Sequence, residues 1–387
     1  MTVAEFLADN GQRLVEVRRD LHAHPELSRE EHRTTELVAD ALSHVGLSPQ
    51  LLPGGTGLTC DLGPEAPTVA LRGDLDALPI PDTKTVSYRS TVEGVAHACG
   101  HDVHTTAVLG AGLVLARMAS TGELTRGVRL VFQPAEEVVP GGALDVIRAG
   151  ALDGIQRMYA LHCDPSVDVG RVGLRVGPIT AASDVIEVRL AGPGGHTARP
   201  HRTADLVSAL GAVVVEAPAL LARRVDPRAG LALVWGQVSA GTAANAIPQS
   251  GVARGTLRTL SHELWDSLPS LVDEVIRAIA TPYRVGIEIT HTRGTPPVVN
   301  DAASVASIEA AVRSSVSGGS VCESEQSLGG EDFAWYLDHV PGALARLGVR
   351  SPGSRTPMDL HQSGFDVDER CIAVGVQLLA GLATAPN

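Results

Sequence analysis

The densest group of side chains capable of chemistry lies in the segment from His97 to His104, which reads HACGHDVH. It holds three histidines, one cysteine and one aspartate within eight residues. If the segment is extended, Cys99 and His101 point to the same side, and both atom types suit a borderline-soft ion such as zinc. His104 is expected at the start of a helix, either supporting the ligands or serving as an ordinary polar residue there. A lone histidine is more often a core residue, but this density favours a metal site.

A pair of adjacent carboxylates, Glu136 and Glu137, follows the apolar run 128–132. Adjacent carboxylates repel each other unless a positive charge lies between them. A solvated acidic turn is the ordinary explanation, but the apolar segment 138–142 that follows does not have the composition of a solvated loop. We therefore interpret one carboxylate as a metal ligand and the other as a general base.

Two further histidines complete a possible ligand set. His162 follows the apolar run 158–161, and His361 lies close to the C-terminus. Each is a weak signal alone, but a catalytic metal site needs three or more protein ligands drawn from separate segments. Together with Cys99, His101 and Glu137 they would supply enough ligands for two ions in one cleft.

Other catalytic signatures are missing from the sequence. It contains no H-E-x-x-H, no G-x-S-x-G, no P-loop and no G-x-G-x-x-G after a strand. The glycine-rich segment 192–196 lacks a lysine and predicts a tight turn that exposes His196. These absences leave the metal-binding cluster as the strongest catalytic signal in the sequence.

The elements that must position these residues alternate between strand and helix in the first part of the chain. Residues 3–24 have helical spacing, and the short apolar runs 68–71 and 128–132 alternate with helical stretches such as 105–118. This pattern predicts an α/β fold with a doubly wound, mixed sheet in which most strands run parallel. Such sheets place their ligands just beyond the strand ends, where the polar clusters occur.

The pattern changes near residue 184. Residues 184–190 alternate like a half-exposed strand, with Val185, Glu187 and Arg189 on one side. A helix (204–223), two strands (231–239 and 251–260), a helix (262–280) and a strand (284–292) follow, which is the β-α-β-β-α-β order of a ferredoxin-like α+β domain. We predict a metal-binding catalytic domain of residues 1–182 and 295–387, interrupted by an inserted domain of residues 183–294.

Composition limits the possible partners and compartment. The net charge of −13 argues against binding to nucleic acid or to anionic membrane surfaces. The five scattered cysteines form no C-x-x-C pair, which predicts no disulfide framework and favours a reducing compartment. Residues 1–14 do not resemble a signal peptide, and the apolar stretch 206–221 is interrupted by Glu216, so we expect a cytoplasmic protein with no membrane partner.

Taken together and in order, the motifs resemble the N-acyl-amino-acid amidohydrolases. This is the hippurate hydrolase and indole-acetyl-amino-acid hydrolase branch of the dinuclear metallopeptidase family that includes aminoacylase. The motifs are RRDLHAHPELS at 18–28, LRGDLDALP at 71–79, HACGHDVH at 97–104, QPAEE at 133–137, GGH at 194–196, PH at 200–201, GTAANAIP at 241–248, GTLRT at 255–259, GGEDF at 329–333 and LH at 360–361. They span nearly the whole chain.

The resemblance implies a role for each candidate residue in the catalytic domain. The implied metal ligands are Cys99, His101, Glu137, His162 and His361, and they would hold two divalent ions (zinc, manganese, cobalt or nickel). Glu136 would be the general base that takes a proton from a metal-bridging water and passes it to the leaving amine. Asp76 would be a carboxylate that orients a ligand.

The inserted domain resembles the family's lid, which also mediates dimerisation. His196 would stabilise the developing oxyanion, in the active site of a partner subunit. Asn245 and Arg258 are candidates to bind the substrate carboxylate, while a structural ion pair is a comparable explanation for Arg258. The expected assembly is a homodimer formed through the lid.

The activity implied by the resemblance is hydrolysis of the amide bond of a small-molecule N-acyl-amino acid. A dipeptidase or deacetylase acting on a peptide-like or cell-wall-derived amide is the alternative, because the same site serves both. A non-catalytic metal-binding protein is a third possibility. The retention of Glu136 beside Glu137 argues against it, since a binding protein needs no base over the water.

Overall fold

The computed structural model describes residues 2–316, 320–354 and 358–385. The chain forms two compact units. The first comprises Met1–Ile179, Val299–Glu325 and Asp332–Asn387, and the second comprises Thr180–Val298 and Gln326–Glu331. The assignment of the short segment Gln326–Glu331 differs from the sequence prediction, which placed it in the catalytic domain. It belongs to the second unit because its backbone contacts that unit: Thr180 forms a bridge with Ser327, and Gly329 accepts a hydrogen bond from Ala181.

The first unit is built on a mixed sheet with the strand order β1-β2-β4-β3-β5-β16-β6-β15. Its strands are β1 (Gln50–Leu51), β2 (Leu58–Leu62), β3 (Pro67–Asp74), β4 (Gly127–Gln133), β5 (Arg157–Asp168), β6 (Arg171–Leu174), β15 (Ser320–Glu323) and β16 (Gly342–Arg350). The central strands β4, β3, β5 and β16 run parallel to one another, whereas β2 and β6 are antiparallel to their neighbours β4 and β16. The predicted mixed α/β fold is confirmed.

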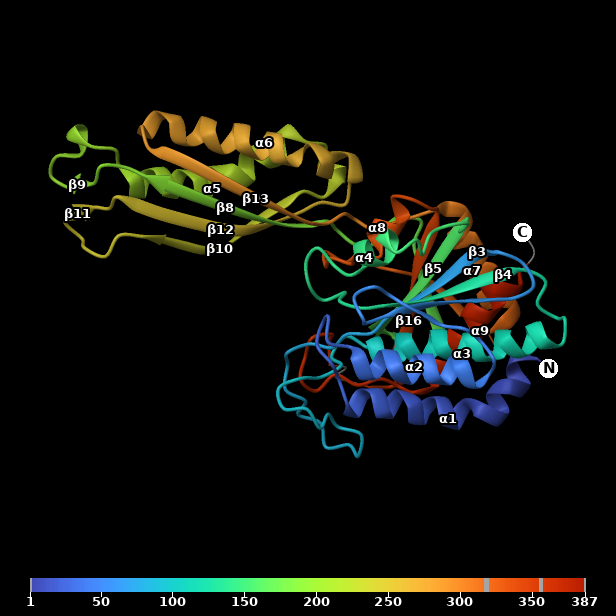
Figure 1. Ribbon diagram of the computed structural model, residues 1–387. Helices are drawn as coiled ribbons and strands as arrows, with labels where there is room; N and C mark the ends of the chain where they lie inside the picture. The colour runs from blue at the N-terminus through green and yellow to red at the C-terminus, as the bar shows by residue number, and fades with distance from the viewer. Residues whose placement is uncertain (1, 317–319, 355–357, 386–387) are drawn as a thin grey trace. The chain divides into compact units, whose positions relative to one another are not determined.

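The helices of the first unit cover the sheet unequally. They are α1 (Val3–Ala23), α2 (His32–His44), α3 (His101–Ser120), α4 (Ala143–Arg148), α7 (Ala302–Ser315), α8 (Ala334–Leu337) and α9 (Arg370–Thr384), and a short β7–β14 pair (Gly177–Pro178 with Val299–Asn300) completes the unit. The five long helices α1, α2, α3, α7 and α9 share one apolar core with the sheet. Figure 1 shows α1, α2 and α3 side by side.

Alternation along the central strands separates this core from a polar face. In β3, Val69 and Leu71 belong to the apolar core, whereas Arg72 and Asp74 are buried on the opposite side. Successive side chains of a strand point to opposite faces, so the same strand serves both. The polar face is where the chemistry collects.

The second unit has the strand and helix order β-α-β-β-α-β that the sequence predicts, with one small strand pair added. Its elements are β8 (Ser183–Ala191), β9 (Gly195–His196), α5 (Leu206–Arg224), β10 (Ala232–Ala240), β11 (Ala246–Ile247), β12 (Ser250–Arg258), α6 (His262–Ala280) and β13 (Gly286–Thr295). The four long strands form an antiparallel sheet of order β10-β12-β8-β13. In β8, Ile186, Val188 and Leu190 are buried and Val185 is exposed, as the alternation predicts.

Two helices, α3 and α5, are long and apolar enough to cross a membrane by length and composition alone. The apolar window of α3 is 67% buried within the protein, which marks it as a core helix, and that of α5 is 33% buried. All five cysteines are free in the structure.

Candidate metal centre

The five predicted metal ligands lie together in the first unit. Ligand atoms of Cys99, His101 and His162 lie within 4.8 Å of one another, and so do those of Cys99, Glu137 and His361. The Sγ atom of Cys99 is 3.6 Å from Nε2 of His162, and Nε2 of His361 is 3.4 Å from Oε1 of Glu137. Because Cys99 belongs to both groups, the cluster is arranged as two adjoining sites that share one thiol.

The side chains of Cys99 and His101 lie close together because of a turn, and not because the segment is extended as the sequence suggested. The segment is not extended, because Gly100 has φ 91° and His101 is the first residue of α3. A Cβ atom at position 100 would lie 2.7 Å from Sγ of Cys163, so only glycine fits this turn. The turn brings both side chains to the start of the helix.

Backbone carbonyls fix the tautomers of two of the histidines. Nδ1 of His101 donates to the carbonyl of Asp76 at 2.9 Å, and Nδ1 of His162 donates to the carbonyl of Cys163 at 2.8 Å. Since a carbonyl only accepts, each Nε2 keeps its lone pair for the cluster. Burial, followed by the nearby charge of Arg346, holds the pKa of His162 well below its usual range, so this imidazole is neutral as a ligand must be.

The two glutamates come from a strained turn after β4. Ala135 has φ 57°, a left-handed conformation that is uncommon outside glycine, and its N–H donates to the carboxylate of Glu31. Glu136 and Glu137 are half-buried, but Val138 and Val139 are exposed. The expectation that 138–142 is shielded from solvent is wrong for residues 138–140, whereas Gly141 and Gly142 are buried. The position of the glutamates therefore depends on the turn at Ala135.

His361 also has a left-handed backbone, with φ 61°. Its N–H donates to the carbonyl of Ala98 at 2.8 Å, which ties the segment before α9 to the residue preceding Cys99. The side chain remains half-exposed, and its contact with Glu137 raises its pKa. His361 is thus the ligand that faces outward from the cluster.

Asp76 holds two of the predicted ligands in place. Its Oδ2 accepts hydrogen bonds from the backbone N–H of Glu137 at 2.9 Å and from the hydroxyl of Ser28 at 2.6 Å, while Oδ1 is 3.3 Å from Nδ1 of His101. Burial alone would raise the pKa of Asp76, but its contacts with His101 lower it, so the group is a carboxylate. This is the orienting arrangement that metal sites generally require.

The donor set fits divalent ions. Nε2 of His101 and Oε1 of Glu137 are buried, have no hydrogen-bond partner and lie 3.7 Å apart. Burial and the Glu137 carboxylate raise the pKa of the Cys99 thiol well above its usual range. A cation would satisfy both orphaned atoms and favour the thiolate, because a coordinating thiol gives up its proton.

Below the cluster lies a buried network that the sequence did not reveal. Nδ1 of His104 donates to Asp74 at 2.7 Å, and the N–H of Cys163 donates to Nε2 of His104 at 2.8 Å. Both ring nitrogens of His104 are thereby used, so it supports the ligands. Arg72 joins Asp74 at 2.6 Å and Asp332 at 2.8 Å, and Gln133 donates to Asp332. The sequence signal that could have indicated this network is the spacing of Arg72 and Asp74, two charged residues that lie on the same face of an otherwise apolar strand.

A second buried network surrounds Asp102. Arg18 and His22 from α1 contact its carboxylate, each at 2.7 Å, and Arg18 also reaches Asp366 and Glu369 before and at the start of α9. Burial alone would raise the pKa of Asp102, but the Arg18 guanidinium, followed by the contact with His22, holds it well below its usual range. The network therefore connects α1 and the start of α9 to the first turn of α3.

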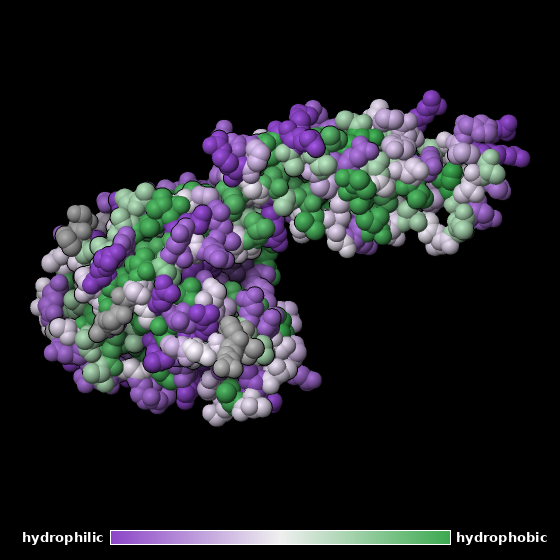
Figure 2. All heavy atoms as spheres, turned by 180° about the vertical axis from the view of Figure 1, so that it is seen from behind, coloured by the Kyte–Doolittle hydropathy of each residue, from purple (hydrophilic) through white to green (hydrophobic). Residues whose placement is uncertain are grey.

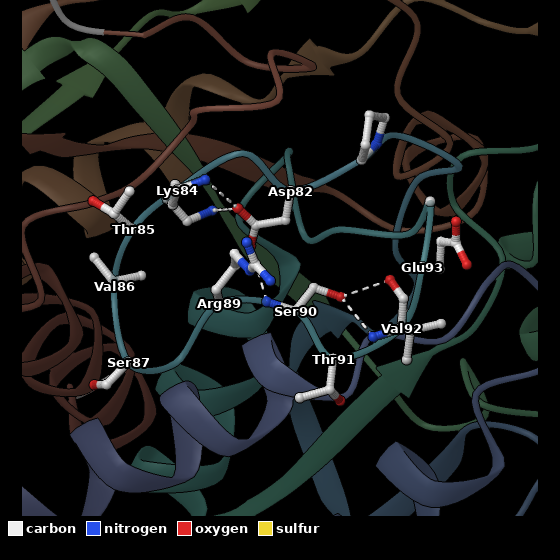
Figure 3. A pocket seen from close by; sticks show the side chains of 12 residues that line it. Asp82, Lys84, Thr85, Val86, Ser87, Arg89, Ser90, Thr91, Val92 and Glu93 are labelled. Atoms are coloured by element: carbon white, nitrogen blue, oxygen red, sulfur yellow. Dashed lines mark hydrogen bonds and ion pairs between the residues drawn. The ribbon is translucent and has the colours of Figure 1, made fainter.

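A separate hollow lies beside this network and contains none of the predicted ligands. Its volume is about 680 Å³, and it is lined by the loop from Pro81 to Gly94. Figure 3 shows Asp82 bonded to Lys84 and to the backbone of Ser90, which gives the loop its shape. All of its lining comes from this one loop, so we do not assign the hollow to the reaction.

The remaining predicted site residues belong to the second unit. His196 in β9 pairs with Ala246 in β11, and the carbonyl of the neighbouring Asn245 accepts from Thr197, so His196 and Asn245 share one hairpin. Nδ1 of His196 accepts from the N–H of Ala198 at 3.0 Å, which leaves a proton on the exposed Nε2. His196 is therefore presented as a hydrogen-bond donor.

Arg258 is not brought to this hairpin within the chain. It ends β12, while the hairpin follows β8 at the end where Ala191 pairs with Ser250. At about 3.3 Å per residue the nine-residue β12 separates them by roughly 25–30 Å. The guanidinium of Arg258 donates to the carbonyl of Leu328, and no ion pair of Arg258 is seen among the described residues.

Comparison with known proteins places this arrangement in one class. Residues 70–385 match the model of peptidase family M20/M25/M40. The chain belongs to this family, and the resemblance inferred from its motifs is confirmed. It is a metal-dependent amidohydrolase whose site takes two divalent ions.

Individual relatives narrow the comparison. The chain is 36% identical to an N-acetyl-L-cysteine deacetylase of Bacillus subtilis, over 93% of this chain and 85% of the relative. The crystal structure of the Bacillus subtilis YXEP protein, described as a dinuclear metal-binding peptidase of the M20 family, superposes with a TM-score of 0.84 at 32% identity, covering 96% of this chain and 97% of that one. A Rhodococcus jostii protein named putative glutamate–cysteine ligase 2-3 is 52% identical over 99% of this chain. This chain spans about half (48%) of that relative's length.

Proposed function

We propose that this protein hydrolyses the amide bond of N-acyl-amino acids, with Glu136 as the general base. The observation that carries the proposal is the cluster of Cys99, His101, His162 and Glu137 with a second glutamate at the adjacent position. A purely structural metal site has no use for an additional carboxylate that is left beside the ligands. A hydrolase needs one within reach of the attacking water.

Each ion would have its own ligand group. Cys99, His101 and His162 would hold one ion, and Cys99, Glu137 and His361 the other. When bound, two divalent ions acidify water and polarise a carbonyl oxygen. The choice among zinc, manganese, cobalt and nickel is not dictated by these ligand types.

The chain's own residues then manage protons and orientation. Glu136 accepts a proton from the water whose oxygen attacks the amide carbon, and it returns that proton to the nitrogen as the carbon–nitrogen bond breaks. The products are a carboxylate and a free amino acid. Asp76 keeps His101 and the backbone of Glu137 in position through this cycle.

The second unit would complete the site from a partner subunit. His196 would donate from Nε2 to the developing oxyanion, and Asn245 on the same hairpin would contact the substrate. Within the second unit, this hairpin lies roughly 25–30 Å from the end of the sheet at which the chain enters and leaves the unit. Arg258, at the opposite end of the sheet, remains a candidate to bind the substrate carboxylate.

A homodimer through this unit is supported by its exposed apolar surface. Val207, Val215 and Leu220 on α5 are exposed, as are Val234 and Val238 on β10, the edge strand of the sheet. Figure 2 shows apolar side chains gathered on the surface of this unit. An apolar helix face beside a free strand edge is typical of a protein–protein interface.

A peptide-like amide is the second candidate substrate. It is supported by relatives named thermostable carboxypeptidase 2 and 1 of Saccharolobus solfataricus, 33% and 32% identical, alongside the relatives named as deacetylases. The hydrolysis step involves only the amide group, so the residues that line the pocket determine which acyl group is accepted. The free cysteines agree with a cytoplasmic location.

The test is release of free amine from a panel of N-acyl-amino acids and dipeptides. The purified protein is stripped of metal and reloaded with zinc, manganese, cobalt or nickel, and N-acetylcysteine is included because of the named relatives. Metal-dependent release from N-acyl-amino acids supports the proposal. Release from dipeptides alone would favour peptide-like amides as the substrate class. No release from any member of the panel would contradict both candidate activities.

A further inference from the structure

Three arginines are buried among the residues that the structure describes, and they differ in their partners. Arg18 is 0% exposed and contacts Asp102, Asp366 and Glu369, while Arg72 is 1% exposed and contacts Asp74 and Asp332. Arg346 is 8% exposed, and its side chain forms no hydrogen bond or ion pair with any described residue.

An unpaired buried guanidinium calls for an explanation. Removing a charge from water is unfavourable unless hydrogen bonds or an opposite charge compensate for it. The guanidinium nitrogens of Arg346 are not among the fully sealed polar atoms, so the accessible part of this residue includes its charged end. The charged end of Arg346 therefore keeps some contact with solvent although the residue is buried.

Strand register determines where the Arg346 side chain lies. Arg346 lies in β16 directly opposite His162 of the parallel neighbour β5, and opposite Gly173 of β6 on its other side. Residues in register on adjacent strands, about 4.8 Å apart, project from the same face. Since Nε2 of His162 points to Cys99 at 3.6 Å, Arg346 stands one strand away from the predicted metal ligands.

The neighbouring backbone leaves room for the side chain. A Cβ atom at position 173 would lie 3.1 Å from Cβ of Arg346 and 3.4 Å from Cβ of Ser324. A larger residue there would press on the arginine, so Gly173 keeps this side of it open.

We propose that Arg346 is a specificity residue that binds a carboxylate of the substrate beside the metal ligands. A guanidinium matches a carboxylate with two parallel hydrogen bonds, and such a pair is strong where water is largely excluded. The carboxylate is supplied by the amino-acid half, at its α-carbon or side chain, or by the far end of a dicarboxylic acyl group. This inference rests on the proposed amide hydrolysis and names the class of substrate: one with an anionic group within reach of Arg346.

The first test compares substrates that differ only by carboxylate against carboxamide. The pairs are N-acetylmethionine and its amide, N-acetylglutamate and N-acetylglutamine, and N-succinylmethionine and N-succinamoylmethionine. Each is measured as kcat/KM with the metal-loaded wild type and with Arg346→Met and Arg346→Lys. Arg350→Met is the matched control, because Arg350 lies on the same strand but is paired with Asp168 at 2.6 Å.

In one of the three pairs, Arg346→Met is expected to lower the ratio of kcat/KM for the carboxylate substrate to that for the carboxamide substrate by about 10- to 100-fold. This is the scale of a hydrogen bond to a charged group. That pair identifies the source of the carboxylate. Arg346→Lys should recover part of the preference, and Arg350→Met should leave it within about threefold, since exposed ion pairs contribute little. If all three preferences are the same in wild type and Arg346→Met, the proposal is overturned.

A second test does not depend on turnover. Succinate and succinamate are titrated calorimetrically into metal-loaded wild type and Arg346→Met, and the variant should bind at least one of them more weakly. Unchanged affinities for both would overturn the proposal even if the enzyme hydrolyses its panel. A weaker affinity in the variant with no hydrolysis of any panel member would instead contradict the proposed reaction and leave the anion site standing.

Thermal unfolding distinguishes this role from a structural one. Methionine has a similar reach and no charge, so Arg346→Met should unfold at the same temperature as wild type or higher. A markedly lower unfolding temperature would assign Arg346 to the stability of the fold and overturn the proposal.

Discussion

The two regions predicted to act on the substrate are supported in opposite ways. In the cluster around His101, Cys99, His101 and His162 are buried, Asp76 holds His101 and the backbone of Glu137 through hydrogen bonds, and the bonded pair of His104 and Asp74 lies buried beside them. The hairpin with His196 and Asn245 is exposed and consists of two two-residue strands. A preorganised centre can perform chemistry by itself, whereas an exposed hairpin gains its geometry only from what it docks against.

The sharpest way to test the buried region is to remove the base and leave the ligands. Glu136→Gln should lower kcat by about 10²- to 10⁴-fold, because the amide cannot take the proton. Metal content measured by mass spectrometry and the unfolding temperature should stay at the wild-type level. Glu137→Gln is the matched control and should also lose metal. Wild-type turnover by Glu136→Gln would remove this residue from the role.

The support beneath the buried region is tested by Asp102→Asn. Leaving Arg18 and His22 without their shared carboxylate should cost about 3–5 kcal/mol of the free energy of unfolding. Urea unfolding at pH 7 measures this, and Arg370→Gln, an exposed arginine paired with Asp368, is a control that should change stability little. A loss below about 1 kcal/mol would show that the network does not stabilise the unit.

The same pair of proteins gives a pH dependence. The folded pKa of Asp102 lies below its unfolded value, which is about 3.9. Its contribution is therefore fully present above that pH and is lost as the pH falls toward the folded pKa. Wild type should lose stability between about pH 4 and pH 2 more steeply than Asp102→Asn. Parallel curves would contradict the assignment.

The exposed region is tested by mixing inactive subunits. His196→Ala alone should lower kcat by about 10²- to 10³-fold, as expected for loss of an oxyanion donor. If His196 acts in trans, a statistical mixture with Glu136→Gln should recover about a quarter of wild-type activity, since half of the dimers are mixed and each contains one intact site. No recovery in mixed dimers isolated by two affinity tags would place His196 in its own subunit's site.

The smallest expected effect concerns the assembly itself. Val215→Asp places a charge on the exposed face of α5, where Val215 is 73% exposed, and should weaken self-association by about tenfold or more. Light scattering over a dilution series measures the dissociation. Leu51→Asp in β1 is the control, because this residue is also exposed but lies in the other unit. Equal dissociation of both variants would argue against an interface on α5.

Much of this protein was readable from local sequence. The helix of residues 262–280 matches α6 residue for residue, and the burial of Ile186, Val188 and Leu190 follows the predicted alternation. These features depend on hydrophobic periodicity, which acts over neighbouring residues. The candidate ligands were also identifiable by type, because cysteine, histidine and glutamate at strand ends are uncommon without a purpose.

Only the tertiary structure decided how those residues meet. Cys99 and His101 come together through the left-handed turn at Gly100, and the lone pairs of His101 and His162 are directed by carbonyls of Asp76 and Cys163. The unpaired state of Arg346 depends on strands β5, β6 and β16, which are far apart in the chain. The sequence determined which chemical groups were available, and the packing determined their partners, because hydrogen bonds and desolvation depend on distances that no local pattern encodes.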